Sequence, residues 1–307
     1  GAGSRVQVRG INSLSPSADN QPLFVIDGIP VSNATDNFAT NASIGISDNF
    51  QTPNRISDLN PDDIETMTVL KGPAASVLYG LRAANGAIVI TTKSGKSGRT
   101  EVSYKTSYSL DNVVKTPPIQ TRYGNGNNGA LASSVNTWGP PIVPGTAVYN
   151  PYDSFFGTGH QFQNSLSISG GNEKATYYTS FSNFDQNGVT PNSEYGKTSI
   201  KLSANYRASE KLKFDASANY IKSGGTNPRT GISSGAIFYL MRHTNTVDPA
   251  DYLNPDGSQK VYNAAIDNPF YFAENSFLTD NVNRIIGTAG IDYSPNSWLN
   301  FNYKLGI

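Results

Sequence analysis

Tyr79-Gly80-Leu81-Arg82-Ala83-Ala84-Asn85-Gly86-Ala87-Ile88-Val89-Ile90-Thr91-Thr92-Lys93-Ser94-Gly95 is the stretch that decides the fold. A turn that contains two glycines leads into a short strand rich in β-branched residues, and a basic segment that ends in glycine follows the strand. Upstream, the sequence mixes short apolar strands with helix-capping residues. Downstream, from Thr100, it consists of long alternating strands. The stretch therefore predicts a joint between a small α/β unit and a β-sheet domain.

The composition is low in both charged and apolar residues. Charged residues make up 15% of the chain and hydrophobic residues 37%, whereas soluble domains average about 25% and 45–50%. A barrel fits these values better, because each of its strands alternates an apolar residue with a small polar one. The 23 basic and 23 acidic residues balance, so nothing indicates a nucleic-acid partner. Cysteine is absent from the sequence, which excludes disulfides and thiol chemistry. No apolar run approaches the roughly 20 residues of a spanning helix, so a membrane would have to be crossed by strands.

Short strands are predicted in the first hundred residues. Each is a brief run of apolar or β-branched residues bounded by glycine, proline or aspartate. The predicted strands are Val6–Gly10, Leu23–Ile26, Thr66–Leu70 and Ala87–Thr92.

Two short helices separate these strands. Asn60 is placed as an N-cap, Pro61 takes the first helical position, and two aspartates follow where they complement the helix dipole. A second helix is expected from Pro73 to Leu78, ended by Gly80. The strands and helices together predict a mixed α/β domain over residues 1–97.

A polar, irregular segment runs from Val31 to Asn54 inside this domain. Loops of this length in a compact domain are often functional. We expect its large apolar groups Phe38 and Phe50, together with Asn49, to contact a ligand. Structural cover of the domain is the alternative.

From residue 98 to 307 the sequence predicts about seven strands with alternating apolar positions. Three turns are short, at 170–174, 208–211 and 294–297, whereas the connections 111–160, 184–197 and 223–283 are long. Short turns at one end and long loops at the other are typical of outer-membrane barrels. We expect three tyrosines to lie beside the short turns, where an interfacial belt would be: Tyr206, Tyr220 and Tyr293.

About seven strands cannot rest in lipid as an open sheet, because unpaired backbone groups at its edges would cost several kcal/mol each. Closure of the barrel therefore demands more strands. The fold class predicted is a mixed α/β plug domain inside an antiparallel transmembrane β-barrel.

The N-terminal segments resemble the plug of the SusC/RagA family, a branch of the TonB-dependent outer-membrane transporters of Bacteroidota. The resemblance rests on the order and content of Val6–Gly10, Pro22–Pro30, Leu59–Glu65, Val69–Gly72 and Tyr79–Gly95. It implies a multi-pass barrel of about 22 strands in the bacterial outer membrane, of which residues 98–307 supply roughly the first third. It also implies a chain that is incomplete at both ends.

The resemblance also implies a function and partners. It implies import of an oligomeric glycan or peptide, powered by TonB acting through a segment before Gly1, with no catalysis. A SusD-like surface lipoprotein would cover the barrel, and two of these receptor–lipoprotein pairs can form a dimer. A surface, assembly or adhesin component that retains the plug and barrel without transporting is the alternative, and a strand-rich soluble enzyme is a second.

The glycine-rich turn is interpreted as structural. Tyr79, Gly80, Arg82, Asn85 and Gly86 are expected to hold it together, with the Arg82 and Asn85 side chains satisfying backbone groups. They are not expected to bind a ligand. Two lysines, at positions 71 and 93, are expected to pair with acidic residues on the barrel wall.

Other motifs carry little chemistry. The glycines of 124–129 match a dinucleotide-binding pattern, but no apolar strand precedes them and no helix follows. The segment 231–235 mimics a nucleophile elbow inside a long loop. Asp248, Asp251, Asn254 and Asp256 could gather around calcium, but solvated turn residues are the simpler interpretation. Residues 236–242 predict a short helix, either core of the longest loop or a partner-facing patch. No catalytic residue, cofactor or metal site is predicted.

Overall fold

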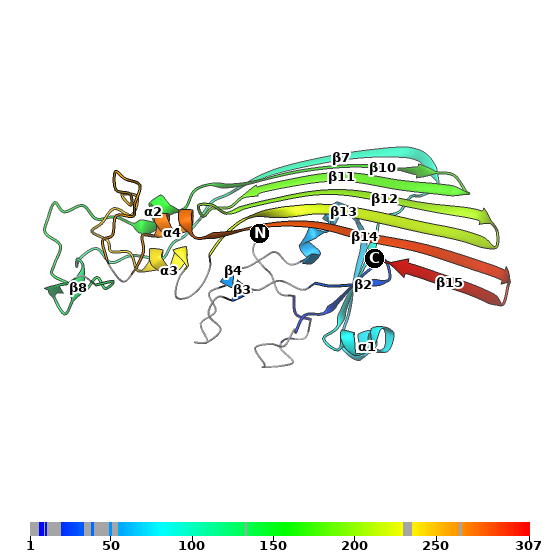
Figure 1. Cartoon of the computed structure of the whole chain (residues 1–307), viewed down its shortest axis with the longest axis horizontal. Coiled ribbons are helices and arrows are strands. Elements are labelled where there is room, and N and C mark those ends of the chain that lie inside the picture. Colours follow the sequence, from blue (N-terminus) through cyan, green and yellow to red (C-terminus); the bar gives the residue numbers. More distant parts are fainter. Residues whose placement is uncertain are drawn as a thin grey trace.

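The computed structural model describes residues 6–8, 10, 20–33, 38–39, 49–50, 55–132, 134–229, 235–263 and 266–307. A small sheet with short helices lies against one face of a long, curved antiparallel sheet (Figure 1). We call the small sheet with its helices, up to residue 97, the plug, and the long sheet the wall. Among the described residues, no helix is both long and apolar enough to cross a membrane.

The plug sheet has the strand order β2-β1-β6-β5. Its centre is apolar because β1 (Leu23–Ile26) and β6 (Ala87–Thr92), which pair in parallel, bury most of their side chains. Antiparallel strands β2 (Ile29–Val31) and β5 (Ile64–Leu70) complete the sheet. The predicted strands that correspond to β1, β5 and β6 are therefore confirmed. The one predicted at Val6–Gly10 is wrong, since its described residues form no strand, although Val6 packs against the plug core.

Helix signals in the plug were correct, but the first helix is a 3-10 turn. It covers Pro61–Asp63, and the Asn60 side chain accepts a hydrogen bond from the Asp62 backbone nitrogen at 3.1 Å. Another 3-10 turn precedes it at Arg55–Asp58. Helix α1 (Pro73–Tyr79) ends at Gly80, and a further 3-10 turn covers Gly80–Ala83.

The wall is a seven-stranded antiparallel meander, in the order β15-β14-β13-β12-β11-β10-β7. This confirms the predicted sheet. The strands are β7 (Gly98–Asp111), β10 (Gly159–Gly171), β11 (Ala175–Asn187), β12 (Glu194–Ser209), β13 (Leu212–Pro228), β14 (Phe277–Asn296) and β15 (Leu299–Gly306).

Several strands extend beyond their predicted ends. The connection between β11 and β12 spans only 188–193, not 184–197, because Asn183 to Asn187 pair with Glu194 to Thr198 in a continuous ladder. Alternation of apolar residues stops near Phe181, but backbone hydrogen bonds continue without it. The asymmetry of short turns and long loops therefore rests on the connections 112–158 and 229–276.

The two faces of the wall differ in chemistry. One face carries exposed apolar side chains from every strand, for example Tyr104, Ile200, Leu202, Ile285 and Leu305. The other is mostly small and polar, and it faces the plug. Such a division matches a wall with lipid on one side and a polar lumen on the other.

The apolar band on β14 runs from Ile285 to Tyr293, which is about 27 Å along the strand and roughly 20 Å along a tilted barrel axis. Tyr206 and Tyr293 lie at its short-turn edge. Tyr220, which the sequence placed there too, pairs with Ile200 and Ile285 at the opposite edge instead. The error arose because β13 is long and Tyr220 is far from its turn.

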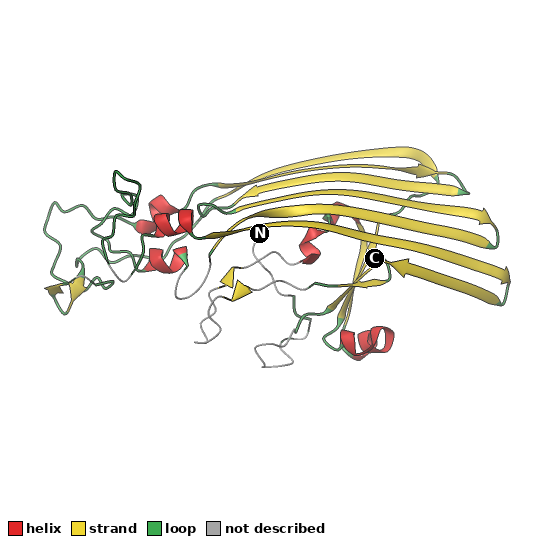
Figure 2. Cartoon of the chain, in the orientation of Figure 1, coloured by secondary structure: helices red, strands yellow, loops and turns green. Residues whose placement is uncertain are grey.

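The described residues of the connections 112–158 and 229–276 gather beyond the end of the wall that is opposite the short turns, and they carry short helices (Figure 2). Helices α2 (Pro151–Phe155), α3 (Ala236–Met241) and α4 (Pro269–Asn275) share one apolar cluster. We call these two connections the loop cap. The cluster confirms the helix predicted at 236–242 and its interpretation as loop core. Two-residue strands β8 (Gly126–Asn127) and β9 (Ala130–Leu131) form a hairpin within the glycine-rich segment.

Candidate functional site

Residues 55–63 of the plug run across the inner face of the wall, and we call them the transverse segment. They follow one row of laterally paired residues, in which each member stands directly opposite the next. The row consists of Lys105, Ser165, Ser182, Ser199, Ile221 and Arg284. Its four middle members are buried. Three of them are serines, whose small side chains leave room for the plug backbone.

A buried charge cluster holds the Arg284 end of the row. Asp58 is fully buried, and its Oδ2 lies 3.6 Å from Arg284 Nη1 and 3.7 Å from Arg55 Nη1. Ser223 Oγ donates to Asp58 Oδ1 at 3.0 Å, and Arg284 Nη1 donates to the Arg55 carbonyl at 2.9 Å. A buried carboxylate is stable only when it is paired in this way. The Arg284 end of the transverse segment is therefore firmly held in one arrangement.

Polar contacts continue along the middle of the segment. Lys197 Nζ donates to the carbonyls of Ser57 and Leu59, at 2.8 and 3.2 Å. Asn60 Nδ2 donates to Ser165 Oγ at 3.3 Å. These contacts join plug groups to two wall strands, β12 and β10, so the segment is fastened across the sheet and not at a single point.

Two aspartates hold the other end of the segment: Asp62 contacts β7 and β10, and Asp63 contacts β11. Lys105 Nζ lies 2.7 Å from Asp62 Oδ1, and Gln163 Nε2 donates to Asp62 Oδ2 at 3.4 Å. Tyr178 OH donates to Asp63 Oδ1 at 2.7 Å. The Lys105 side chain is 68% exposed. Because exposed ion pairs contribute little, this end is held more weakly than the Arg284 end.

Apolar contact reinforces the tight end. Ile221 and Ile286 face the lumen from β13 and β14 and are buried in one cluster with plug residues. The plug members are Phe24, Ile26, Leu59, Ile88 and Ile90. The plug core therefore docks on the same side of the wall as the buried charge cluster.

In the ion pairs between plug and wall, the plug supplies the acidic residue and the wall supplies the basic one, which is the reverse of the arrangement that we expected. We expected Lys71 and Lys93 to pair with wall acids, but within the described residues neither makes an ion pair. Plug acids meet wall bases instead. Lys93 takes part through its backbone, whose carbonyl accepts from Lys201 Nζ at 2.8 Å.

The predicted turn lies at the edge of the plug. Tyr79 is the last residue of α1 and packs beside the buried alanines at positions 75, 83 and 87. Gly80 follows with a φ of 70°, a left-handed backbone conformation that favours glycine.

Gly86 has the tightest surroundings in the turn. Its φ is 97°, and a Cβ at this position would lie 2.9 Å from the Leu70 carbonyl oxygen. Its nitrogen donates to the Ala83 carbonyl at 2.9 Å, so backbone contacts shape the turn. Arg82 is exposed. The roles assigned to the Arg82 and Asn85 side chains stay predictions.

The expected ligand-contact residues come together in backbone pairing. Strand β3 (Phe38–Ala39) pairs antiparallel with β4 (Asn49–Phe50), which places Phe38 opposite Phe50. Ligand contact by Phe38, Asn49 and Phe50 stays a prediction. The rest of their loop, 34–37, 40–48 and 51–54, lies outside the described residues.

The acidic loop has local partners for its side chains. Asp251 pairs with Lys260, and Asp256 Oδ1 accepts from the Ser258 hydroxyl at 2.6 Å. Asp248 Oδ1 accepts from a backbone nitrogen two residues on. No group of three or more His, Cys, Asp or Glu residues suited to a metal occurs in the described part of the chain.

The TonB-dependent receptor plug domain family matches residues 1–87. The chain is 31% identical over 315 residues to the TonB-dependent receptor SusC of Bacteroides thetaiotaomicron, a match that covers 95% of this chain and 29% of that protein. It is 29% identical to the TonB-dependent receptor P26 of Formosa agariphila, covering 97% of this chain and 28% of that protein. The chain thus spans less than a third of the length of these relatives.

Solved structures share the fold. The RagAB peptide importer in its open-open state matches with a TM-score of 0.70 at 20% identity, over 98% of this chain and 35% of that one. Its closed-closed state matches with a TM-score of 0.66 over the whole of this chain. The arrangement of plug against wall therefore also occurs in an experimentally determined structure.

Proposed function

Because this chain belongs to the SusC/RagA family of TonB-dependent receptors, we propose that it acts in the energised import of an oligomeric nutrient, a peptide or a glycan. The family is one of outer-membrane transporters, not enzymes. The chain spans only part of its relatives, so the proposal concerns the whole protein to which these residues belong. Within the chain, we place the plug at residues 1–97 and the first part of the barrel at 98–307.

The observation that carries the proposal is the transverse segment. It closes the lumen side of the wall through hydrogen bonds and ion pairs, with apolar packing concentrated at one end. Exposed polar contacts such as Lys105–Asp62 can be exchanged for water at a small net free-energy cost, whereas the buried charge cluster and the apolar core at the Arg284 end cannot. A seal of this kind is suited to a plug that is remodelled and restored in each transport cycle.

Force on the plug would come from TonB in the periplasm, and a SusD-like lipoprotein would cover the barrel from outside. The loop cap would meet such a partner, because the long connections of an outer-membrane barrel are extracellular, and dimers of receptor–lipoprotein pairs would extend the assembly. Phe38, Asn49 and Phe50 would contact the solute from the plug side. The peptide importer in the RagAB complex supports peptides as one class of solute.

Uptake measurements test the proposal. Cells that carry the intact gene, a deletion, or the deletion with the gene restored are given fluorescent oligopeptides or oligosaccharides of the same size. The proposal requires gene-dependent uptake of one class, abolished when TonB is inactivated or the proton gradient is collapsed. A receptor that is folded in the outer membrane, but whose deletion changes uptake of neither class, would instead favour a surface or assembly role.

A further inference from the structure

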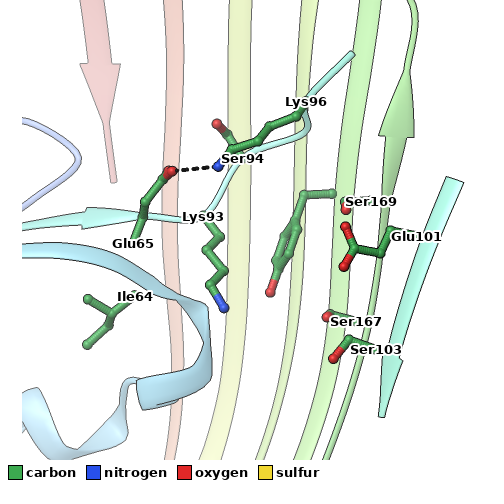
Figure 3. A pocket seen from close by; sticks show the side chains of 10 residues that line it. Ile64, Glu65, Lys93, Ser94, Lys96, Glu101, Ser103, Ser167 and Ser169 are labelled. Carbon is green, nitrogen blue, oxygen red and sulfur yellow. Dashed lines mark ion pairs between the residues drawn. The ribbon is translucent and has the colours of Figure 1, made fainter. Parts of the chain in front are cut away.

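A cavity of about 330 Å³ lies between the plug and the wall strands β7 and β10 (Figure 3). Its wall residues lie on the short-turn side of the transverse segment. On β7, Glu101 and Ser103 precede Lys105, and on β10, Ser167 and Ser169 follow Ser165. The Asp62–Lys105 ion pair crosses from plug to wall next to the cavity, on its loop-cap side. The volume falls within the range of small-molecule sites, about 300–1,000 Å³.

Two opposite charges in this cavity have no ion-pair partner among the described residues: Lys93 on the plug and Glu101 on the wall. The other charged pair in its lining is satisfied, since Lys96 Nζ lies 3.0 Å from Glu65 Oε1. Figure 3 shows Lys93 extending from the plug side and Glu101 from the wall side. The cavity therefore offers one cationic and one anionic group to a solute.

The remaining lining supplies hydroxyl groups but no free aromatic face. Four serines border the cavity. Its aromatic ring, Tyr178, is already engaged, because the hydroxyl donates to Asp63 and Lys201 Nζ lies 5.3 Å from the ring centroid. A sugar needs an open ring face to pack its C–H surface, whereas a zwitterion needs separated opposite charges with hydrogen-bonding groups between them.

We propose that this cavity is a binding subsite for short peptides with free termini. It lies on the periplasmic side of the plug, because the short turns of outer-membrane barrels face the periplasm. Lys93 binds the terminal carboxylate and Glu101 binds the terminal ammonium group. The hydroxyls of Ser94, Ser103 and Ser167 hydrogen-bond the peptide unit between them, whereas Ser169 borders the cavity without a role in binding. This inference rests on the proposed function, because it assigns the solute class to the exit side of the transport path. A solute held here has already passed the Asp62–Lys105 ion pair.

Thiol protection tests the subsite in the intact purified receptor. The 307 residues contain no cysteine, so Ser169→Cys in a cysteine-free background reports on the cavity alone. Dialanine at about ten times its Kd should slow maleimide labelling about tenfold, because it leaves about a tenth of the sites free. N-acetyl-dialanine amide, which lacks both charges, and maltose should not slow it.

Three variants in the Ser169→Cys background identify the binding groups. Lys93→Gln and Glu101→Gln should each abolish protection by dialanine. Lys96→Gln, which removes a cation already paired with Glu65, is the matched control and should retain it. Unchanged heat-modifiable gel mobility of each variant establishes that the barrel is folded.

The outcomes separate the subsite from the proposed function. No protection by dialanine, equal protection by maltose or the blocked peptide, or protection that survives Lys93→Gln and Glu101→Gln overturns the subsite, even if cells take up oligomers normally. Protection with the expected pattern upholds it, even if TonB-dependent uptake is absent and the proposed function fails.

Discussion

Lys105 and Arg284 stand at opposite ends of one cross-strand row of the wall, and each pairs with an aspartate of the same plug segment. The two ends differ in burial. Asp58 beside Arg284 is fully buried, whereas the Lys105 side chain is mostly exposed. Charge pairs of the first kind are costly to break and those of the second are not. The plug is therefore anchored at β13 and β14 and is most easily released at β7.

Arg284→Ala should destabilise the plug strongly. The change leaves Asp58 buried beside a weaker set of partners, and breaking a buried pair typically costs about 3–5 kcal/mol. Hydrogen–deuterium exchange of residues 55–63 in the purified receptor should rise sharply. Lys304→Ala, which breaks a half-exposed pair with Asp215, serves as the control. Equal exchange in the two variants would argue against an anchor at Asp58.

Lys105→Ala should leave stability nearly unchanged but loosen the β7 end. An exposed pair contributes about 0–1 kcal/mol, so the melting temperature of the receptor should shift little. Conductance in planar bilayers should nevertheless increase, because the edge of the plug beside β7 is freed. A melting temperature lowered as far as in Arg284→Ala, with no added conductance, would reverse the assignment of the two ends.

Gly86→Ala should be more harmful than Gly80→Ala. Both positions have positive φ, but a Cβ at Gly86 would lie 2.9 Å from a backbone oxygen, whereas at Gly80 nothing lies within 4 Å. We expect Gly80→Ala to lower the free energy of unfolding of the plug by about 1–2 kcal/mol through backbone strain, and Gly86→Ala to lower it by more. Protease resistance of the plug during urea titration measures both. Similar urea midpoints for the two variants would contradict the crowding at Gly86.

The loop cap should loosen at acid pH through His243. Burial lowers the pKa of this imidazole, although the Thr244 carbonyl and Asp248 act in the opposite direction. The Tyr262 ring lies beside the imidazole, with 4.5 Å between the two ring centroids. Burial raises the pKa of the Tyr262 hydroxyl. A lowered histidine pKa means that the unfolded state binds the proton more readily. The loop cap therefore has its full stability above about pH 6.5, and it loses stability as the pH falls toward the pKa of His243 in the folded state.

Hydrogen exchange of residues 243–263 at pH 7.5 and pH 5, corrected for intrinsic rates, measures this effect. The wild type should open more at pH 5, and His243→Gln should remove most of the difference. His160→Gln, on strand β10, should retain it. A pH dependence that persists unchanged in His243→Gln would assign the effect to other groups.

Local signals in the sequence predicted most of the fold. The Asn60 cap, the glycine that ends α1 and the apolar run of β1 each depend on nearby residues only, and all were correct. Alternation located the seven wall strands because one face is apolar along its length. It underestimated the length of β11 and β12, whose outer ends carry two isolated aromatic residues, Phe184 and Tyr195, and no regular alternation of apolar residues.

The plug–wall contacts could not be predicted in the same way. Asp62 was interpreted as a helix-dipole residue, and its partner Lys105 was one of several isolated charges on lumen-facing positions. Pairing the two requires the strand register, which sets which residues of separate strands share a row. An isolated basic residue on an otherwise serine-rich lumen face was the available signal, but one sequence does not identify its partner.

Disulfide trapping of Asn60→Cys with Ser165→Cys tests the central claim most directly, namely that the transverse segment lies across the inner face of the wall. These side chains are in hydrogen-bond contact, at 3.3 Å, and the chain has no cysteine of its own. Mild oxidation of outer membranes should cross-link residues 60 and 165 nearly completely, detected as a linked peptide pair after digestion. Failure to cross-link, with both cysteines labelled freely by a small thiol reagent in the folded receptor, would contradict the account.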